Sequence, residues 1–233
     1  MAAVTEIRLK TGIPGLDPLI QGGLQKGDFI LLLGDLGTGK TVFSSQFVYN
    51  SAKLYNETAV FATFEEDTRS LKRNMLRFGM DLNALEKEGK IKVLDLEALE
   101  GRGMGSNIEA LLKALDDIGA RRLVVDSMTA FMSGAEQKFD YSFLMHLIYK
   151  TLKREGVTTL MTVSKPQGSG IVPEMGVEEF VADGIFELRN YISRDVEIKT
   201  QFLIRKMRGT EHSRKFHSVL FTPHGMEILP YTP

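Results

Sequence analysis

The feature that most restricts how this chain can fold is a glycine-rich segment, Gly34-Asp35-Leu36-Gly37-Thr38-Gly39-Lys40-Thr41. It fits the pattern G-x-x-x-x-G-K-[ST], which needs a buried strand before it and a helix after it. The apolar run at residues 29–33 supplies the strand, and residues 41–55 can form the helix. Glycines let the backbone curl so that several N–H groups point into one concavity, and the helix adds the positive end of its dipole. The segment therefore predicts a polyphosphate-binding loop.

Individual positions of this loop have separate expected roles. The Lys40 ammonium would reach the β- and γ-phosphate oxygens, and the Thr41 hydroxyl would hold Mg²⁺. The alternative is a glycine-rich turn without a ligand, but the strand-loop-helix context disfavours it. The residues expected to contact the ligand are Gly34, Gly37, Thr38, Gly39, Lys40, Thr41 and Val42.

The composition is that of an ordinary globular protein. The 233 residues suit one α/β domain, 1–233, and the net charge of −1 gives no overall attraction to nucleic acid or anionic lipid. The absence of cysteine excludes disulfides, thiolate catalysis and cysteine metal sites. Neither a secretory signal nor a membrane-spanning run is visible, so we expect a soluble, cytoplasmic protein.

Strand-like apolar runs alternate with helical stretches along most of the chain, which is typical of βαβ units and a mainly parallel sheet. Strands are expected at residues 29–33, 58–64, 91–94, 122–126, 158–163 and 184–188. Helices are expected at residues 41–55, 69–78, 108–115 behind a cap at Ser106 or Asn107, and 141–155. Two further β-rich runs, 199–204 and 216–221, predict an antiparallel extension. Residues 131–139 and 165–177 are expected to be long loops.

The strand at residues 122–126 ends in an acid, Asp126. Beside a phosphate loop, such an acid can hold Mg²⁺ through water, although an aspartate at a strand end also commonly serves in turns and helix caps. Because the phosphate loop lies upstream at a suitable separation, we assign Asp126 to the metal site together with Thr41.

Two adjacent carboxylates, Glu65 and Glu66, follow the strand at residues 58–64, which we expect to lie beside the phosphate-loop strand. Hydrolysis needs a group that orients or deprotonates the attacking water. Glu65 is the first choice for this base, and Glu66 either assists or exchanges roles with it. The alternative is an acidic helix N-terminus, in which Glu65, Glu66 and Asp67 favour the helix dipole without any catalysis. The residues alone leave the two interpretations equal.

Together these motifs resemble the KaiC-type ATPases of the RecA superfamily, over residues 11–230. The resemblance rests on the phosphate loop and on residues 11–17, 22–23, 63–66, 124–127, 176–183 and 206–212. It implies an α/β fold: a RecA-like P-loop NTPase core with a mainly parallel twisted sheet, flanking helices and a C-terminal antiparallel β extension. It also implies Mg²⁺-dependent hydrolysis of ATP, with Lys40, Glu65 and Glu66 as catalytic residues.

In KaiC-like rings, the residues that match Lys206 and Arg208 reach the γ-phosphate bound by the neighbouring subunit, and those matching Met207, Thr210 and His212 lie near that nucleotide. The resemblance therefore implies a homo-oligomer, expected to be a hexameric ring, with nucleotide at the subunit interfaces. A basic cluster, Arg205, Lys206, Arg208, Arg214 and Lys215, agrees with a cation supplied in trans. The alternative is a solvated basic hairpin or a nucleic-acid surface.

Several positions depart from the family pattern. The strand at residues 158–163 runs into Ser164-Lys165-Pro166-Gln167, where many relatives carry Glu or Gln, and Gln167 is a candidate γ-phosphate sensor. Pro223 replaces the family's acidic residue near the nucleobase, and Arg77 replaces a small polar residue after the catalytic glutamates, so base selectivity can differ. Glu179 and Phe180 stand where the autokinase half of KaiC has its phosphorylated hydroxyls, which predicts a domain of the non-kinase type.

Three functions follow from these observations. The leading one is a ring-forming ATPase that couples hydrolysis to a conformational or assembly change in an unknown protein partner. The second is a recombinase-like DNA-binding protein, which residues 165–179 disfavour because they hold one lysine against three glutamates and no aromatic stacking platform. The third is a nucleotide-dependent scaffold with little hydrolysis. The four histidines lack partners at metal-ligand spacing, so Mg²⁺ is the expected metal.

Overall fold

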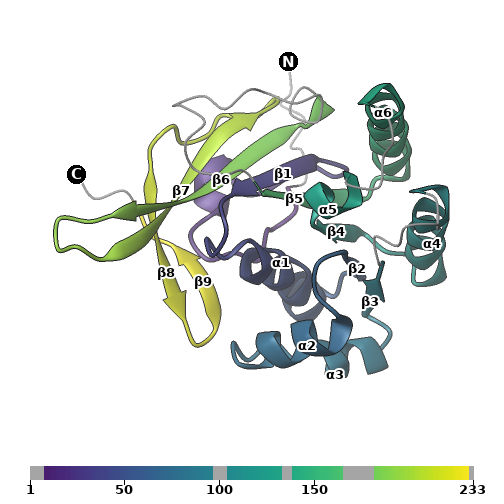
Figure 1. The fold of residues 1–233 in the computed structure, drawn as a ribbon, viewed down its shortest axis with the longest axis horizontal. Coiled ribbons are helices and arrows are strands. Elements are labelled where there is room, and N and C mark those ends of the chain that lie inside the picture. The colour runs from purple at the N-terminus through teal and green to yellow at the C-terminus, as the bar shows by residue number, and fades with distance from the viewer. Residues whose placement is uncertain (1–7, 97–103, 133–137, 165–180, 231–233) are drawn as a thin grey trace, which may run out of the picture.

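The computed structural model describes residues 8–96, 104–132, 138–164 and 181–230, which form a nine-stranded mixed sheet with helices on both faces (Figure 1). The strands are β1 Phe29–Gly34, β2 Ala59–Thr63, β3 Ile91–Asp95, β4 Arg122–Asp126, β5 Thr158–Ser164, β6 Gly184–Ile192, β7 Ile198–Met207, β8 His217–Thr222 and β9 Gly225–Ile228. The helices are the short 3-10 helix η1 Asp17–Ile20, then α1 Lys40–Tyr55, α2 Thr68–Leu76, α3 Leu82–Lys87, α4 Met104–Asp117, α5 Met128–Met132 and α6 Lys138–Glu155.

The strand order is β3-β2-β4-β5-β1-β6-β7-β8-β9. The six strands from β3 to β6 in this order are parallel, and β7, β8 and β9 add to them in antiparallel fashion. The predicted parallel sheet with a C-terminal antiparallel extension is therefore confirmed.

The expectation that the strand before Glu65 lies beside the phosphate-loop strand was wrong. β5 and β4 lie between β1 and β2, because α1 crosses over the sheet and delivers the chain to the far side of β4 (Figure 1). Consecutive strands in such open α/β sheets need not be neighbours. The backbone amide of Phe64 donates to the carbonyl of Asp126 at 2.8 Å, so the segment that follows β2 stays next to the end of β4.

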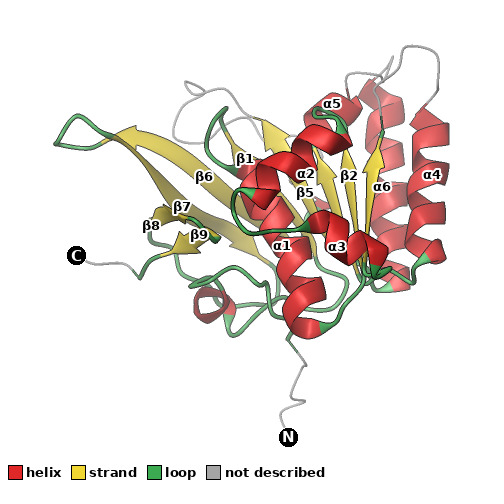
Figure 2. Cartoon of the chain, turned by 90° about the horizontal axis from the view of Figure 1, so that it is seen from below, coloured by secondary structure: helices red, strands yellow, loops and turns green. Residues whose placement is uncertain are grey.

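Strand β1 is buried on both faces of the sheet, and its side chains alternate between two hydrophobic cores. Ile30 and Leu32 pack with residues of α1, α2 and α3, whereas Phe29, Leu31 and Leu33 pack with residues of α4 and α6. Figure 2 shows these two helix layers on opposite sides of the sheet. Burial on both faces explains why β1 is a continuous apolar run, and it fixes the point from which the phosphate loop leaves the sheet.

Some helix boundaries differ from the prediction. α4 begins at Met104 and contains both Ser106 and Asn107, so the predicted cap was wrong. α5 and α6 occupy the two ends of the segment expected to be a loop at residues 131–139, which shortens that loop. The second expected loop, 165–177, lies outside the described residues.

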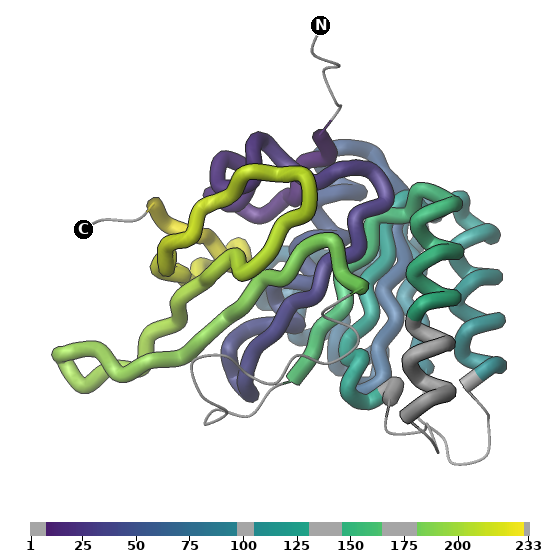
Figure 3. The backbone as a smooth tube through the Cα atoms, turned by 90° about the horizontal axis from the view of Figure 1, so that it is seen from above, coloured from purple at the N-terminus to yellow at the C-terminus, as the bar shows by residue number. Residues whose placement is uncertain are grey.

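β6 and β7 continue beyond the rest of the sheet as a hairpin that projects from the body of the molecule (Figure 3). Among the described helices, none is long and apolar enough to cross a membrane.

Candidate functional site

The glycine-rich loop leaves β1 at Gly34 and enters α1 at Lys40. Gly37 and Gly39 have φ angles of +74° and +91°, which favour glycine. A Cβ atom on Gly39 would also come within 2.7 Å of the Phe221 ring. The loop is therefore a tight turn that brings backbone amides to the N-terminus of a 16-residue helix, an arrangement that attracts anions.

The Lys40 side chain lies over this loop. Its Nζ donates hydrogen bonds to the carbonyl oxygens of Gly34 and Asp35, both at 3.0 Å. Burial lowers the pKa of Lys40, and the negative charges of Asp126, Glu65 and Asp35 oppose that shift. The Lys40 ammonium therefore lies near these three carboxylates, at the carboxyl ends of the parallel strands.

Asp126 ends β4 and is almost fully buried. Its Oδ1 accepts a hydrogen bond of 2.5 Å from the Thr162 hydroxyl, and it also forms a hydrogen bond with Thr41. Burial raises the pKa of Asp126, and the two hydroxyl groups oppose that shift. The structure therefore brings together Thr41 and Asp126, the two residues predicted to hold the metal.

These oxygen donors fit Mg²⁺, which commonly takes one or two carboxylates and fills its other positions with water and phosphate oxygens. Over the described residues, no group of three or more His, Cys, Asp or Glu side chains could form a cage of protein ligands. The chemistry of the donor set is thus that of a cation bound together with a phosphate ligand.

Glu65 and Glu66 follow β2 and have different partners. The Ser127 hydroxyl donates to Oε1 of Glu65, and the Asn74 amide donates to Oε1 of Glu66 at 2.6 Å. Burial raises the pKa of Glu66, to which the charges of Asp67 and Asp126 add, whereas the Asn74 hydrogen bond lowers it. Glu65 is the more exposed of the pair.

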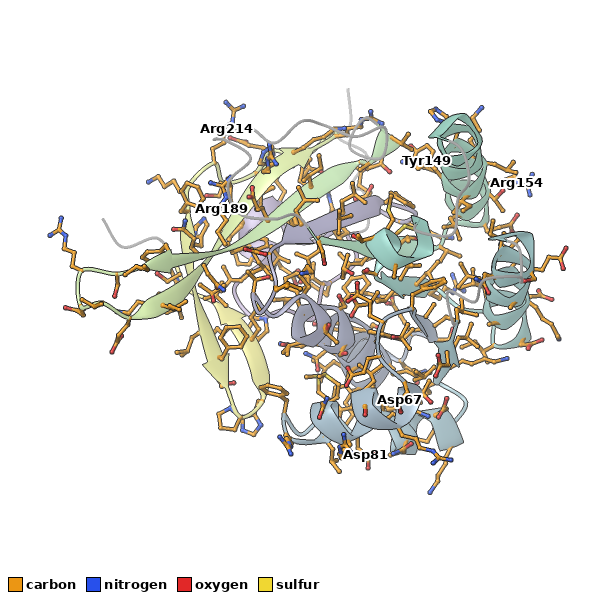
Figure 4. All side chains as sticks on the ribbon, viewed as in Figure 1. Asp67, Asp81, Tyr149, Arg154, Arg189 and Arg214 are labelled. Atoms are coloured by element: carbon orange, nitrogen blue, oxygen red, sulfur yellow. The ribbon has the colours of Figure 1, made fainter. Side chains whose placement is uncertain are left out.

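Neither glutamate caps α2. The cap is Asp67, whose Oδ1 accepts from the backbone amides of Arg69 and Ser70, both at 3.0 Å (Figure 4). The capping hydrogen bonds of the acidic run therefore come from Asp67, and both glutamates lie just before the helix.

Sequence reasoning missed the polar partners Asn74, Ser127 and Thr162. A signal existed for Ser127, because it directly follows the acid that ends β4. Asn74 and Thr162 lie inside a helix and a strand, where an isolated polar residue has many possible explanations.

Lys206 and Arg208 lie at the edge of the sheet where the parallel strands begin, whereas the phosphate loop lies at the opposite edge, where these strands end. Met207 pairs with Gly184 at the start of β6, and Gly184 pairs with Ile30 near the start of β1. The loop follows the other end of β1, whose six residues span roughly 17 Å at about 3.3 Å per residue. The two predicted parts of the site are therefore far apart within one chain.

The remaining residues of this segment have defined contacts. Met207 is buried in the hydrophobic core, so only its backbone can face a ligand. The Thr210 hydroxyl accepts a hydrogen bond from Arg8 at 2.7 Å, and His212 Nδ1 lies 3.1 Å from the Thr210 carbonyl oxygen. Arg205, a member of the basic cluster, has a side chain that is 15% exposed and lies 3.6 Å from Glu187.

Two of the departures from the family pattern, Arg77 and Pro223, occupy neighbouring segments. Arg77 is the C-cap of α2, and Pro223 lies in the turn between β8 and β9. A Cβ on Gly79, just after α2, would lie 3.8 Å from the His224 ring in that turn. Lys165, Gln167, Glu179 and Phe180 lie outside the described residues.

Comparison with known proteins identifies the family. The KaiC ATPase family model matches residues 9–232. The chain is 35% identical over 234 residues to the circadian clock oscillator protein KaiC of Synechococcus elongatus, which covers 96% of this chain. The chain belongs to the KaiC ATPase family. The resemblance expected from the motifs is confirmed.

The chain spans less than half of some relatives and nearly the whole length of others. This chain covers 44% of the Synechococcus clock protein. By contrast, it covers 96% of the UPF0273 protein MJ1359 of Methanocaldococcus jannaschii, with 33% identity over 240 residues. The crystal structure of the KaiC-like protein PH0186 from Pyrococcus horikoshii superposes with a TM-score of 0.87, at 38% identity, and the match covers 96% of this chain and 99% of that one.

Proposed function

We propose that this KaiC-family chain binds ATP with Mg²⁺ and hydrolyses it in a homo-oligomeric ring whose sites form between subunits. The observation that carries the proposal is the position of Arg208 and the phosphate loop at opposite edges of one sheet. A cation at one edge cannot serve the loop of its own chain, but it can serve the loop of a neighbour.

The phosphate loop and Lys40 would bind the triphosphate. Backbone amides at the start of α1 offer donors to the phosphate oxygens, and the Lys40 ammonium would move from the carbonyls of Gly34 and Asp35 to the β- and γ-phosphates. Thr41 and Asp126 would hold Mg²⁺, which when bound neutralises charge on the phosphates.

Glu65 would orient the attacking water and accept its proton. It lies close enough to Lys40 and Asp126 for their charges to interact, and Ser127 fixes its carboxylate. Phosphoryl transfer depends mainly on positioning and charge neutralisation, so a carboxylate held beside the γ-phosphate position suffices as the water-orienting group.

Lys206 and Arg208 would supply positive charge to the γ-phosphate of the neighbouring subunit. This arrangement makes each site incomplete in an isolated chain, and hydrolysis then depends on assembly. A change in nucleotide state would alter subunit contacts directly, which is how we expect the ring to act on a protein partner.

The test is to mix two inactive variants. Lys40→Ala removes the charge in the phosphate loop, and Arg208→Ala removes the cation at the other edge. Each variant alone should hydrolyse ATP slowly. Mixed subunits should regain activity, with a maximum at an intermediate ratio, because some interfaces pair an intact loop with an intact Arg208. A flat activity profile in a mixture that light scattering shows to be co-assembled would contradict the proposal.

A further inference from the structure

Asp183 joins segments that are distant in sequence, just before β6 begins. Its Oδ2 accepts hydrogen bonds from the Phe29 amide at 3.1 Å and from the Lys153 ammonium at 2.7 Å. Tyr149 lies on α6 (Figure 4), and its hydroxyl donates to Oδ1 of Asp183 at 3.3 Å. Asp183 is only 4% exposed. These contacts fix the carboxylate at the edge where the parallel strands begin.

The same carboxylate faces Arg208. The Arg208 Nη1 lies 3.9 Å from Oδ1 of Asp183 and donates to the Val181 carbonyl at 3.3 Å. The Arg208 amide donates to the Asp183 carbonyl at 2.8 Å. Half of the Arg208 side chain, 50%, is exposed. Both the backbone and the guanidinium of Arg208 are thus positioned by residues 181–183, while part of the side chain stays accessible to another molecule.

Lys153 is the closer cation of the two that face Asp183. Burial lowers the pKa of Lys153, but the hydrogen bond and the negative charge of Asp183 outweigh it, so the pKa is raised overall. Lys153 is therefore protonated at neutral pH and neutralises Asp183 at short range. Without it, the carboxylate would attract the Arg208 guanidinium more strongly and reduce the positive charge that Arg208 presents outward.

We infer that Asp183 is a positioning residue that aims Arg208 at the nucleotide of the neighbouring subunit, with Lys153 as the counter-ion that keeps the arginine available. The inference rests on the proposed function and adds the residues that prepare Arg208 before subunits meet. A cation already held in place costs little reorganisation when charge develops on the transferring phosphoryl group.

Asp183→Asn is the first variant to measure. Asparagine keeps the size and one acceptor for the Phe29 amide, but it loses the charge that orients Arg208. Turnover should fall by roughly 10-fold to 100-fold, the scale of a small misplacement, with the KM for ATP little changed because the variant's own loop is intact. Asp117→Asn is the matched control, since Asp117 also pairs with lysines, at 2.8 and 3.0 Å, but lies on α4. Its turnover should match the wild type.

Mixing experiments separate positioning from a folding defect. Asp183→Asn should gain activity when mixed with Lys40→Ala, which contributes an intact Arg208, and should gain none when mixed with Arg208→Ala. A folding defect would suppress both mixtures equally, and the variants of Lys153 would then decide. Wild-type turnover of Asp183→Asn alone would overturn the inference. If Arg208→Ala and Lys40→Ala fail to complement each other when co-assembled, the proposed function itself fails.

Lys153 gives an independent test if Asp183→Asn does not fold. Lys153→Met should lower turnover although Asp183 and Arg208 are both present, and Lys153→Arg should restore it by restoring the charge. Wild-type turnover of Lys153→Met would overturn the role of Lys153 as counter-ion.

Discussion

Glu65 and Glu66 are adjacent in the chain, yet their surroundings give them different chemistry. Glu65 is exposed and receives a hydrogen bond from Ser127, whereas Glu66 receives one from Asn74 and has a raised pKa. We expect Glu65→Gln to keep ATP affinity and to lower turnover by about 10²-fold, the usual scale for a positioned base. Glu66→Gln should have a smaller effect. Steady-state ATPase rates and equilibrium ATP titration measure both quantities, and the opposite order of effects would exchange the roles.

Asp28 should make stability depend on pH. Burial, with a further contribution from Asp183, raises the pKa of Asp28 to about 6, although the Gln25 amide and the charges of Lys153 and Arg8 act in the other direction. A carboxyl group whose pKa is higher in the folded than in the unfolded chain stabilises the folded state at low pH. That contribution disappears as the pH rises from about 4 to 6.

Between these pH values, the unfolding free energy of the wild type should fall by roughly 2–3 kcal/mol because of Asp28, at 1.36 kcal/mol per pKa unit. Asp28→Asn cannot ionise at this position, so its unfolding free energy should lack this fall. Denaturant titrations of both proteins at several pH values would measure the difference. Parallel stability curves for the two proteins over this range would exclude the raised pKa.

Helix α2 depends on Asp67 for its first turn, so the cap can be tested apart from the glutamates. Asp67→Ala should lower the unfolding free energy by about 1 kcal/mol, and Asp67→Asn should retain most of the cap. The denaturant midpoint reports this change. If Asp67→Ala instead lowered turnover as strongly as Glu65→Gln at unchanged stability, the Asp67 carboxylate would act in ATP hydrolysis and not as a helix cap.

Elements with a local signal could be predicted, and those defined by distant partners could not. The phosphate loop, its strand and α1 follow from glycine spacing and an apolar run, and the structure places them as expected. Strand β9 has four residues and is held by Gln46 of α1, which donates to the Met226 carbonyl at 3.0 Å and accepts from its amide at 2.7 Å. No local sequence pattern predicts such a contact. The order of strands was also missed, because the sequence of a crossover connection does not indicate which strands become neighbours in the sheet.

At the scale of the whole molecule, the sequence supplied candidate residues for the site but not their positions in space. Lys206 and Arg208 were expected near a neighbour's nucleotide only through the family resemblance. Sheet topology supplies the physical support, since the antiparallel return of β7 carries these residues to the edge opposite the phosphate loop. If Lys206 and Arg208 act in hydrolysis as proposed, this separation requires that two chains meet.

A ligand that contacts two chains should promote their association. If ATP is bound by the loop of one subunit and by Arg208 of the next, it binds the assembled state more tightly than the isolated chain. When both states are saturated with ATP, this linkage favours assembly by about 1.4 kcal/mol per site for each tenfold difference between the two affinities. Light scattering should therefore show ATP with Mg²⁺ shifting the wild-type protein toward a larger assembly at low protein concentration.

Lys40→Ala should not respond to ATP in this experiment, because its loop binds the phosphates weakly. Arg208→Ala should bind ATP through its own loop and yet assemble less readily than the wild type, because the contact from the neighbouring chain is missing. That combination of retained binding and weakened assembly distinguishes a nucleotide shared between subunits from one held within a single chain. If Arg208→Ala assembled with ATP as readily as the wild type, the nucleotide would not be bridging the interface through this residue.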